Sequence, residues 1–374
     1  MSLFFGGGIE YAMVIEVECL CLHVCIAGDL PIQKGSCVIL KKDMNRILVE
    51  GTIRRTLKSM KESPERTIRN LVDLGLNFSN GRFQTRFLKA AQEMLHNQKS
   101  AYYSLVKHVA ASVDHDLLTT FGVNLGYNSC TLGAKRIREI EAERGYNIPW
   151  SLTLAINEEK LDAEPDFYPT VVRQGIPMGI YTYLLFSIGD PEKLLPLMKA
   201  QPDCAFIVFL RGHQISDAFI RKMKAVKNVM ISIYVNEDMP GACQKLRDAR
   251  LLYAVYQRYT EQDREHILSG QWLSTVLPVH PAFAFLRTEP GCDPETQEGI
   301  YSYVTSVRDG QQYPVVLMDI KQDTLQIDRV ISDGECLVGF DFDGSLKTHE
   351  GIMRGEEYNI FHHRLEDVLQ AAAI

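Results

Sequence analysis

The feature that most constrains the fold is a regular alternation, beginning after Trp150, of short apolar runs with amphipathic segments. The runs are apolar on both faces, as is typical of buried parallel strands, and amphipathic helices are predicted between them. We therefore predict an α/β fold with a full or partial βα barrel, and we expect its chemistry at the C-terminal ends of the strands. The predicted strands are residues 151–156, 179–187, 204–210, 229–235, 251–256, 281–287 and 313–320, and the clearest helices are 191–200, 216–225 and 241–249.

The residues before the alternation follow a different pattern. Segments 13–26 and 36–49 are rich in Val, Ile, Leu and Cys and are predicted strands, whereas the apolar spacing from 52 to 115 is helical. A strongly charged helix is predicted over 132–144, ending at Gly145, because glycine commonly stops helices. We predict an N-terminal strand and helical region over 1–116 and the barrel over 117–323.

The last fifty residues are expected to form a third unit, 324–374. Segments 324–332 and 335–342 flank Asp333-Gly334, and an Asp-Gly pair between two apolar segments predicts a β-hairpin. Residues 365–372 are amphipathic and are predicted to form a terminal helix.

Composition excludes several classes of function. The 374 residues carry a formal net charge of −7, and the basic residues are dispersed, which disfavours binding to nucleic acid. The most apolar N-terminal segment, 11–32, contains Glu16, Glu18, His23 and Asp29, so we predict neither a membrane helix nor a signal peptide. Nine cysteines without a regular framework indicate reduced thiols, and we expect a cytoplasmic protein.

The order of segments resembles the radical S-adenosylmethionine (radical SAM) superfamily, in particular its SPASM-like group. The second predicted strand, GIYTYLLFS, is followed by Ile188-Gly189-Asp190-Pro191, which is similar to the family's GGEP loop. Residues 206–215 look like the family's third strand and 228–234 like its fourth, and VISDGECLVGF resembles its DGxVxPC segment. The resemblance implies a residual S-adenosylmethionine-type face formed by Gly189, Asp190, Arg211 and Ser232.

The first strand departs from the family pattern. In the family a CxxxCxxC loop follows this strand and holds a 4Fe–4S cluster, but this chain has no cysteine between Cys130 and Cys204. Residues 157–166 supply carboxylates in place of the thiolates that a cluster needs. Where the C-terminal hairpin would carry its cluster cysteine the chain has Gly339, with Cys336 three positions earlier.

These departures favour a catalytically degenerate, cluster-free barrel that acts as a binding or accessory protein. We expect no cofactor, and S-adenosylmethionine or a 4Fe–4S cluster only if the family chemistry survives. A small-molecule or peptide ligand is expected at the barrel mouth, and a protein partner is a further expectation. No catalytic residue is assigned.

An enzyme that uses the same mouth for a different reaction is the alternative hypothesis. Asp190, Arg211, His213 and the carboxylates of 157–166 would then act as acid and base groups or as ligands of a hard metal ion. The same residue types are common as solvated loop charges, which is the simpler interpretation.

Three further motifs were weighed against simpler interpretations. Asp341-Phe-Asp343-Gly-Ser resembles the motif of haloacid-dehalogenase-type phosphatases, with Asp341 as nucleophile and Asp343 as general acid, but too few residues follow to supply the other groups. The second motif is a group of loop histidines with nearby glutamates, namely His349, Glu350, Glu356, Glu357, His362 and His363. The third is Cys19, Cys21, His23 and Cys25, which share one face of a predicted strand. An extended strand spaces these side chains too far apart for them to bind one ion. We predict no metal site from either of these two groups.

Overall fold

The computed structural model describes residues 38–59, 66–67, 69–70, 72–73, 89, 92–93, 95–332 and 334–373. A nine-stranded sheet forms its centre, in the order β7-β6-β5-β4-β3-β2-β1-β8-β9. Neighbouring strands from β7 through β8 are parallel, and only β9 runs antiparallel. The strands are β1 (Ser151–Ala155), β2 (Thr182–Phe186), β3 (Ala205–Leu210), β4 (Val229–Tyr234), β5 (Tyr253–Tyr259), β6 (Phe283–Thr288), β7 (Val316–Asp319), β8 (Val338–Phe340) and β9 (Leu346–Lys347).

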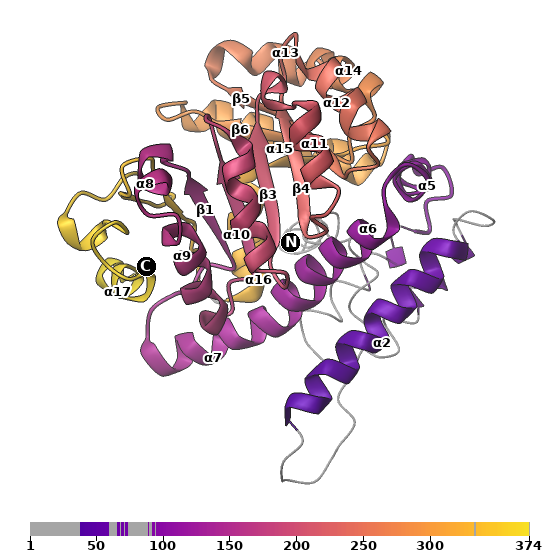
Figure 1. Cartoon of the computed structure of the whole chain (residues 1–374). Helices are drawn as coiled ribbons and strands as arrows, with labels where there is room; N and C mark the ends of the chain where they lie inside the picture. Colours follow the sequence, from indigo (N-terminus) through magenta and orange to yellow (C-terminus); the bar gives the residue numbers. More distant parts are fainter. Residues whose placement is uncertain are drawn as a thin grey trace, which may run out of the picture.

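The seven strands predicted after Trp150 are all present, and the predicted α/β fold with a partial barrel is confirmed. The sheet curls without closing, because β7 and β9 are its two edges. Helices follow the strands in the predicted alternation (Figure 1). They are α8 (Glu158–Ala163), α9 (Phe167–Gly175), α10 (Leu195–Ala200), α11 (Asp217–Met223), α12 (Met239–Asp248), α13 (Arg264–Leu268), α14 (Gln271–Val276), α15 (Pro294–Gly310) and α16 (Ile320–Ile331).

The concave face of the sheet is filled in its lower part by apolar side chains. Leu184, Ile207 and Phe285 from three strands line a small space of about 40 Å³ together with Ile327 of α16. The indole of Trp150 donates a hydrogen bond to the carbonyl of Thr324 on the same helix, at 3.2 Å. Helix α16 therefore packs inside the half-barrel and leaves only the upper part of its concave face open.

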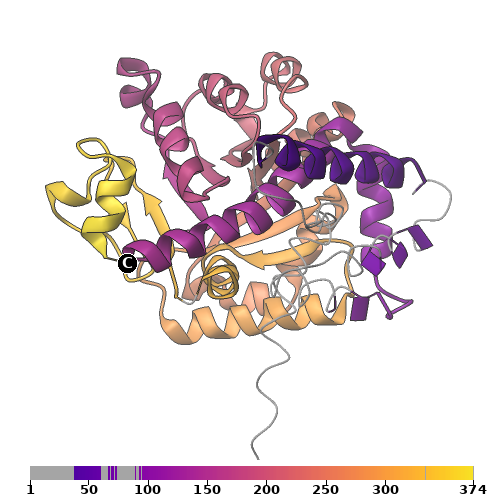
Figure 2. The same cartoon turned by 90° about the horizontal axis from the view of Figure 1, so that it is seen from below.

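One helical run closes the base of the sheet. It consists of α6 (His115–Gly122), the π-helix η1 (Val123–Gly133) and α7 (Ala134–Arg144), and Figure 2 shows it from below the strands. Asn124 and Asn128 of η1 donate hydrogen bonds to backbone carbonyls at residues 202–204, just before β3, at 2.7–2.9 Å. The predicted charged helix and its end at Gly145, where φ is +75°, are confirmed.

The predicted strand over 36–49 is wrong. From Val38 onward this segment belongs to helix α2 (Val38–Ser59). Its buried residues Val49, Ile53 and Leu57 are spaced four apart, which is a helical period that continues beyond the segment read as a strand. The predicted strand 13–26, and with it Cys19, Cys21, His23 and Cys25, lies outside the described residues.

The predicted position of the C-terminal hairpin is also wrong. Residues 324–331 belong to α16, whose buried Leu325, Asp328 and Ile331 follow a helical spacing. The hairpin is formed instead by β8 and β9, and it turns at the other Asp-Gly pair, Asp343-Gly344, where Gly344 has φ +82°. The terminal helix α17 (Leu365–Ala372) is confirmed. Strand β8 from the third predicted unit pairs with β1 of the second, and the division into three domains stays a prediction.

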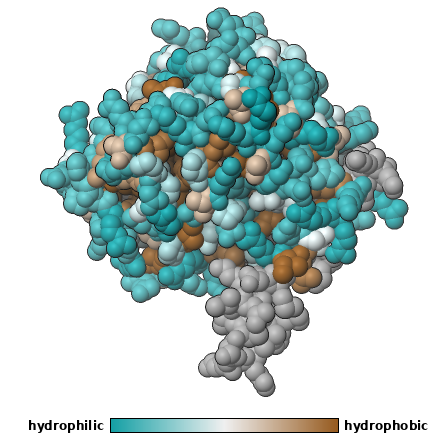
Figure 3. Space-filling view, in the orientation of Figure 1, coloured by the Kyte–Doolittle hydropathy of each residue, from teal (hydrophilic) through white to brown (hydrophobic). Residues whose placement is uncertain are grey.

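The described surface is mostly polar. The face in Figure 3 is largely hydrophilic, with apolar residues in small scattered groups. Among the described residues, the large apolar side chains that stand exposed are Ile47, Leu48, Ile188, Phe342 and Ile352. No helix of the described part combines the length and apolar character needed to cross a membrane.

Asp328 makes the stability of the fold depend on pH. It is fully buried, it accepts a hydrogen bond from the backbone N–H of Cys336, and burial raises its pKa from 3.8 to about 8. The folded chain thus holds a proton that the unfolded chain releases, so stability is greatest below pH 4 for this group and falls as pH rises toward 8. We expect a slope of about 1.4 kcal/mol per pH unit in the middle of that window.

Urea unfolding of the wild type and of Asp328→Asn between pH 5 and pH 8 measures this slope. The variant is expected to lose most of it, and the exposed Asp248→Asn is the matched control that should retain it. Equal slopes in the wild type and in Asp328→Asn would contradict a protonated carboxyl in the core.

Candidate functional site

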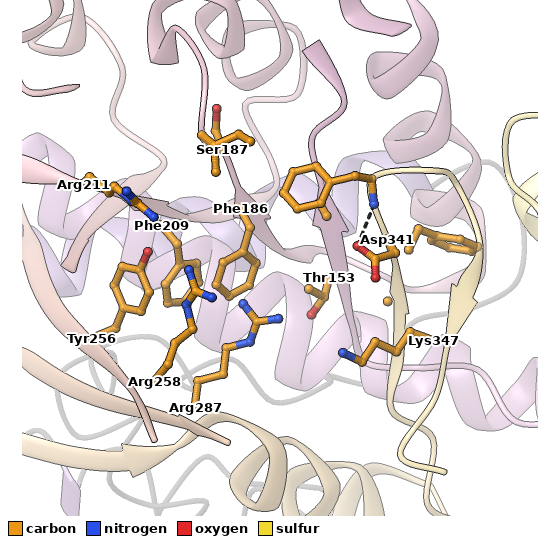
Figure 4. Close-up of a pocket in the computed structure, with 15 residues that line it drawn as sticks. Thr153, Phe186, Ser187, Phe209, Arg211, Tyr256, Arg258, Arg287, Asp341 and Lys347 are labelled. Carbon is orange, nitrogen blue, oxygen red and sulfur yellow. Dashed lines mark hydrogen bonds between the residues drawn. The ribbon is translucent and has the colours of Figure 1, made fainter. Parts of the chain in front are cut away.

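A cavity of about 160 Å³ opens at the C-terminal ends of the parallel strands. Its floor consists of the rings of Phe186 at the end of β2 and Phe209 in β3, which are stacked with their centroids 4.1 Å apart and nearly parallel (Figure 4). Tyr256 of β5 meets Phe209 edge-on at 5.1 Å. Side chains alternate between the two faces of a strand, so the inward positions of successive strands meet at one rim.

The wall above this aromatic floor is strongly basic. Arg258 of β5, Arg287 of β6 and Lys347 of β9 line the cavity, together with Arg211 just after β3. Asp341 is the single acidic residue of the lining. In a chain with a net charge of −7, four basic side chains against one carboxylate are a local reversal of charge.

Most of these basic groups have no ionic partner in the described part of the chain. Arg258 Nη1 lies 3.0 Å from the Glu289 carboxylate, but among the described residues Arg211, Arg287 and Lys347 have no carboxylate oxygen within 4.0 Å. The guanidinium of Arg287 lies over the ring of Phe186, 4.3 Å from its centroid. This cation–π contact compensates only part of the loss of water around the charge.

The pKa values of the cavity residues follow from this crowding of positive charge. Burial, and next the charge of Arg258, lowers the pKa of Arg287. Burial, and next the charge of Arg287, lowers the pKa of Lys347. For Tyr256, burial raises the pKa, against the opposing effect of Arg258, Arg287 and Arg211. The charge of Arg258 therefore acts on Arg287, and the charge of Arg287 acts on Lys347, through the same space.

A second cavity of about 340 Å³ adjoins the first and extends toward the open side of the half-barrel. The two share Thr153, Phe186, Arg287, Gly339 and Lys347, so Arg287 and Lys347 stand at their junction. We call the smaller one the first chamber and the larger one the second chamber. The second chamber is lined further by polar and charged side chains, namely Thr288, Glu289, Gln297, Lys321, Thr348, His349 and Glu350.

Of the four residues predicted for a cofactor face, one lines the first chamber. Arg211 does so, whereas Asp190 caps the short helix η3 (Pro191–Leu194) by accepting the N–H of Glu192 at 2.9 Å. The carbonyl of Gly189 accepts a hydrogen bond from Gln214, at 2.6 Å. Ser232 is fully buried in β4, and its hydroxyl has no hydrogen-bond partner among the described residues. Binding of a cofactor by the four together stays a prediction.

The other proposed acid and base groups lie outside both chambers. Lys193 forms ion pairs with Glu158 and Asp162 at 2.7 Å each, so these carboxylates of α8, just after β1, share one cation. The hydrogen bond from Lys193 lowers the pKa of Glu158. His213 is more than half exposed, with Nδ1 3.9 Å from the Asp238 carboxylate.

The described residues do not fit a 4Fe–4S cluster at the end of β1. A cluster is held by thiolates, but residues 157–166 contain none, and the described cysteines are all buried. Burial raises the pKa of the Cys243 thiol to about 12 and that of the Cys204 and Cys336 thiols well above their usual range. These thiols stay protonated at neutral pH, and residues 157–166 offer no thiolate that could hold iron.

The structure also shows where the remaining sequence motifs lie. Asp341 lines the first chamber, but its Oδ1 accepts the N–H of Phe342, and Asp343 accepts the N–H of Ser345 within the β8–β9 turn. These contacts give the motif a role in the turn. Within the described part, the proposed group of histidines and glutamates does not converge. The one group of potential metal ligands found there is Glu261, Cys292 and Asp293.

Sequence reasoning missed Arg258, Arg287 and Lys347. The signal for the first two was present, since YAVYQRY and FAFLRT each place a basic residue on the face shared with Tyr256 or Phe285 near the end of a predicted strand. Lys347 could not be predicted as a cavity residue, because the hairpin that carries it was predicted at the wrong Asp-Gly pair.

Fold and site together define a parallel α/β half-barrel with a basic cavity at its C-terminal rim. No known family model matches the chain, and no curated protein does. Among solved structures it is similar to SuiB of Streptococcus suis bound to precursor peptide SuiA, with 10% identity, a TM-score of 0.46, and 62% of this chain and 67% of that chain covered. It is also similar to SuiB bound to S-adenosylmethionine, with 11% identity, a TM-score of 0.45, and 81% of each chain covered. Values this low assign neither a family nor a function.

Proposed function

We propose that this chain is a cluster-free, radical-SAM-like half-barrel that works as a binding or accessory protein and takes a small-molecule ligand at its mouth. The observation that carries the proposal is the pair of joined chambers at the C-terminal rim, where α/β barrels bind their ligands. The second chamber alone has the volume of a typical small-molecule site.

The segment after β1 supports the binding role over radical chemistry. In place of thiolates it presents Glu158 and Asp162, and both are held by Lys193. Lysine-paired carboxylates at the surface are structural contacts and offer iron no sulfur ligand. The alternative of acid–base catalysis loses support for the same reason, since of its proposed groups only Arg211 lines the first chamber.

Anaerobic reconstitution with iron and sulfide tests the absence of a cluster. The full chain is expected to bind less than one iron per molecule after desalting, to show no cluster absorption near 400 nm, and to leave S-adenosylmethionine intact under a strong reductant. Stoichiometric iron and sulfide together with cleavage of S-adenosylmethionine would overturn the proposal.

Native mass spectrometry of the chain, purified without denaturation, tests the binding role. We expect a fraction of molecules to carry an additional small mass that is released on unfolding. Filling the mouth with Ala155→Trp is expected to remove that mass, because Ala155 lines the first chamber, while Ala225→Trp outside both chambers is the matched control. Retention of the mass in Ala155→Trp would place the ligand elsewhere.

A further inference from the structure

We propose, on the basis of the proposed function, that the ligand is a small organic anion with at least two negative charges, held between Arg287 and Lys347. These side chains stand at the junction of the first and second chambers and line both. In Figure 4 the ammonium group of Lys347 points toward the guanidinium of Arg287, which lies with that of Arg258 next to the rings of Phe186 and Phe209.

The charge of the site sets the minimum charge of the ligand. The two chambers together have five basic side chains and three carboxylates, and among the described residues the one ion pair within 4.0 Å between them is Arg258 with Glu289. A single carboxylate placed at the junction would neutralise one of the remaining cations and leave the others unpaired. An anion with two or more charges satisfies Arg287 and Lys347 together and stays within reach of Arg211.

The chemistry of Arg287 fits an oxyanion in particular. Its guanidinium lies over the face of Phe186, so its N–H groups point away along the edges of its plane. An edge of this kind donates two parallel hydrogen bonds to a carboxylate or phosphate group. Lys347 supplies a compact point charge from the opposite wall. The shared ligand chemistry is therefore an oxyanion group, carried by either a phosphate ester or a polycarboxylate.

The enclosure of the site favours a small molecule. The chambers measure about 160 Å³ and 340 Å³, and the second adds polar contacts from Gln297, Lys321 and His349. The Nδ1 atom of His349 is buried without a hydrogen-bond partner among the described residues. A bound polar group would satisfy it, so the uncharged part of the ligand is expected to lie in the second chamber.

The unpaired cations also imply a cost in the ligand-free protein. Arg287 and Lys347 are partly desolvated and repel each other, and crowding of this kind destabilises a fold until an anion binds. Removing either charge should therefore weaken binding and at the same time stabilise the empty protein. A residue whose role is purely structural would show the opposite effect on stability.

Calorimetric titration of the full chain at pH 7.5 with pyrophosphate, citrate or inorganic phosphate tests the inference, with sodium chloride at matched ionic strength as the salt reference. We expect saturable binding of pyrophosphate or citrate. Tighter binding of pyrophosphate would indicate a phosphate ligand, and tighter binding of citrate a carboxylate ligand. Arg287→Met and Lys347→Met are each expected to weaken this binding at least tenfold and to raise the melting temperature of the empty chain. Arg221→Met and Lys224→Met, both exposed on or next to α11, are matched controls that should change neither.

The outcomes separate this inference from the function it rests on. If neither polyanion binds beyond the effect of salt, or if both variants bind as the wild type does, the polyanion inference is wrong. If the purified chain nevertheless carries a neutral small molecule at its mouth, the binding function stands and only its ligand class changes. A reconstituted cluster would instead overturn the function itself.

Discussion

Replacing Arg308 with methionine is expected to destabilise the fold by about 3–5 kcal/mol, because it leaves a buried charge without its partner. Arg308 and Asp323 are each about 1% exposed, and Arg308 Nη1 lies 2.8 Å from the Asp323 carboxylate. The pair joins α15 to α16, the helix that fills the lower concave face. Urea unfolding at pH 7 measures the loss.

A double variant shows whether the loss comes from the uncompensated charge. Asp323→Asn retains an oxygen that accepts the N–H of Asp319, which now bonds to the carboxylate at 2.8 Å. Combined with Arg308→Met it removes both charges, and we expect it to recover at least half of the lost stability. The exposed pair of Arg173 and Asp166, at 2.6 Å, supplies the matched control, and Arg173→Met should cost under about 1 kcal/mol. Equal losses at the two positions would contradict the assignment.

Gly133→Ala is expected to cost about 1–3 kcal/mol, because the added methyl group would meet backbone that has no room to shift. A Cβ atom at Gly133 would lie 2.3 Å from the carbonyl oxygen of Gly179 and 3.0 Å from that of Asn128. Gly179 is itself at φ +98° and approaches Gly133 from the loop before β2. The contact fixes the junction of η1 and α7 against the base of the sheet.

Gly51→Ala is the matched control for this effect. Gly51 also lies in a helix, α2, but nothing stands within 4 Å of a Cβ atom placed there. Alanine favours the helix over glycine, so this variant should gain about 0.5–1 kcal/mol. Urea unfolding of both variants is sufficient, and a Gly133→Ala variant as stable as the wild type would show that the close approach is absent in solution.

The alternation of apolar strands and helices was enough to predict the sheet. Strands such as FIVFL and VMISI are buried on both faces, so periodicity and burial indicate the same parallel arrangement. Asp-Gly pairs are less informative, because Asp333-Gly334 and Asp343-Gly344 have equal local propensity for a turn. Only packing decides between them, since residues 324–331 bury Leu325 and Ile331 as a helix inside the half-barrel.

The site was predictable in position and less so in composition. Its place at the C-terminal rim followed from the parallel strands, and Arg211, which was predicted for the cofactor face, lines the first chamber. The carboxylates of 157–166 share the same end of the sheet, but Lys193 on the next helical segment holds two of them away from the chambers. Side-chain pairing between loops depends on tertiary geometry, which no local pattern in the sequence records.

The β8–β9 hairpin is joined to the rest of the sheet through β1 alone, since β9 is an edge strand. Lys347 and Asp341 therefore belong to a wall that pairs with a different part of the sheet from β5 and β6, which carry Arg258 and Arg287. The separation between Lys347 and Arg287 thus depends on how β8 packs against β1, whereas the aromatic floor is formed by β2 and β3. The packing of the hairpin on β1 therefore sets the distance between Lys347 and Arg287, and with it the length of the molecule that fits between them.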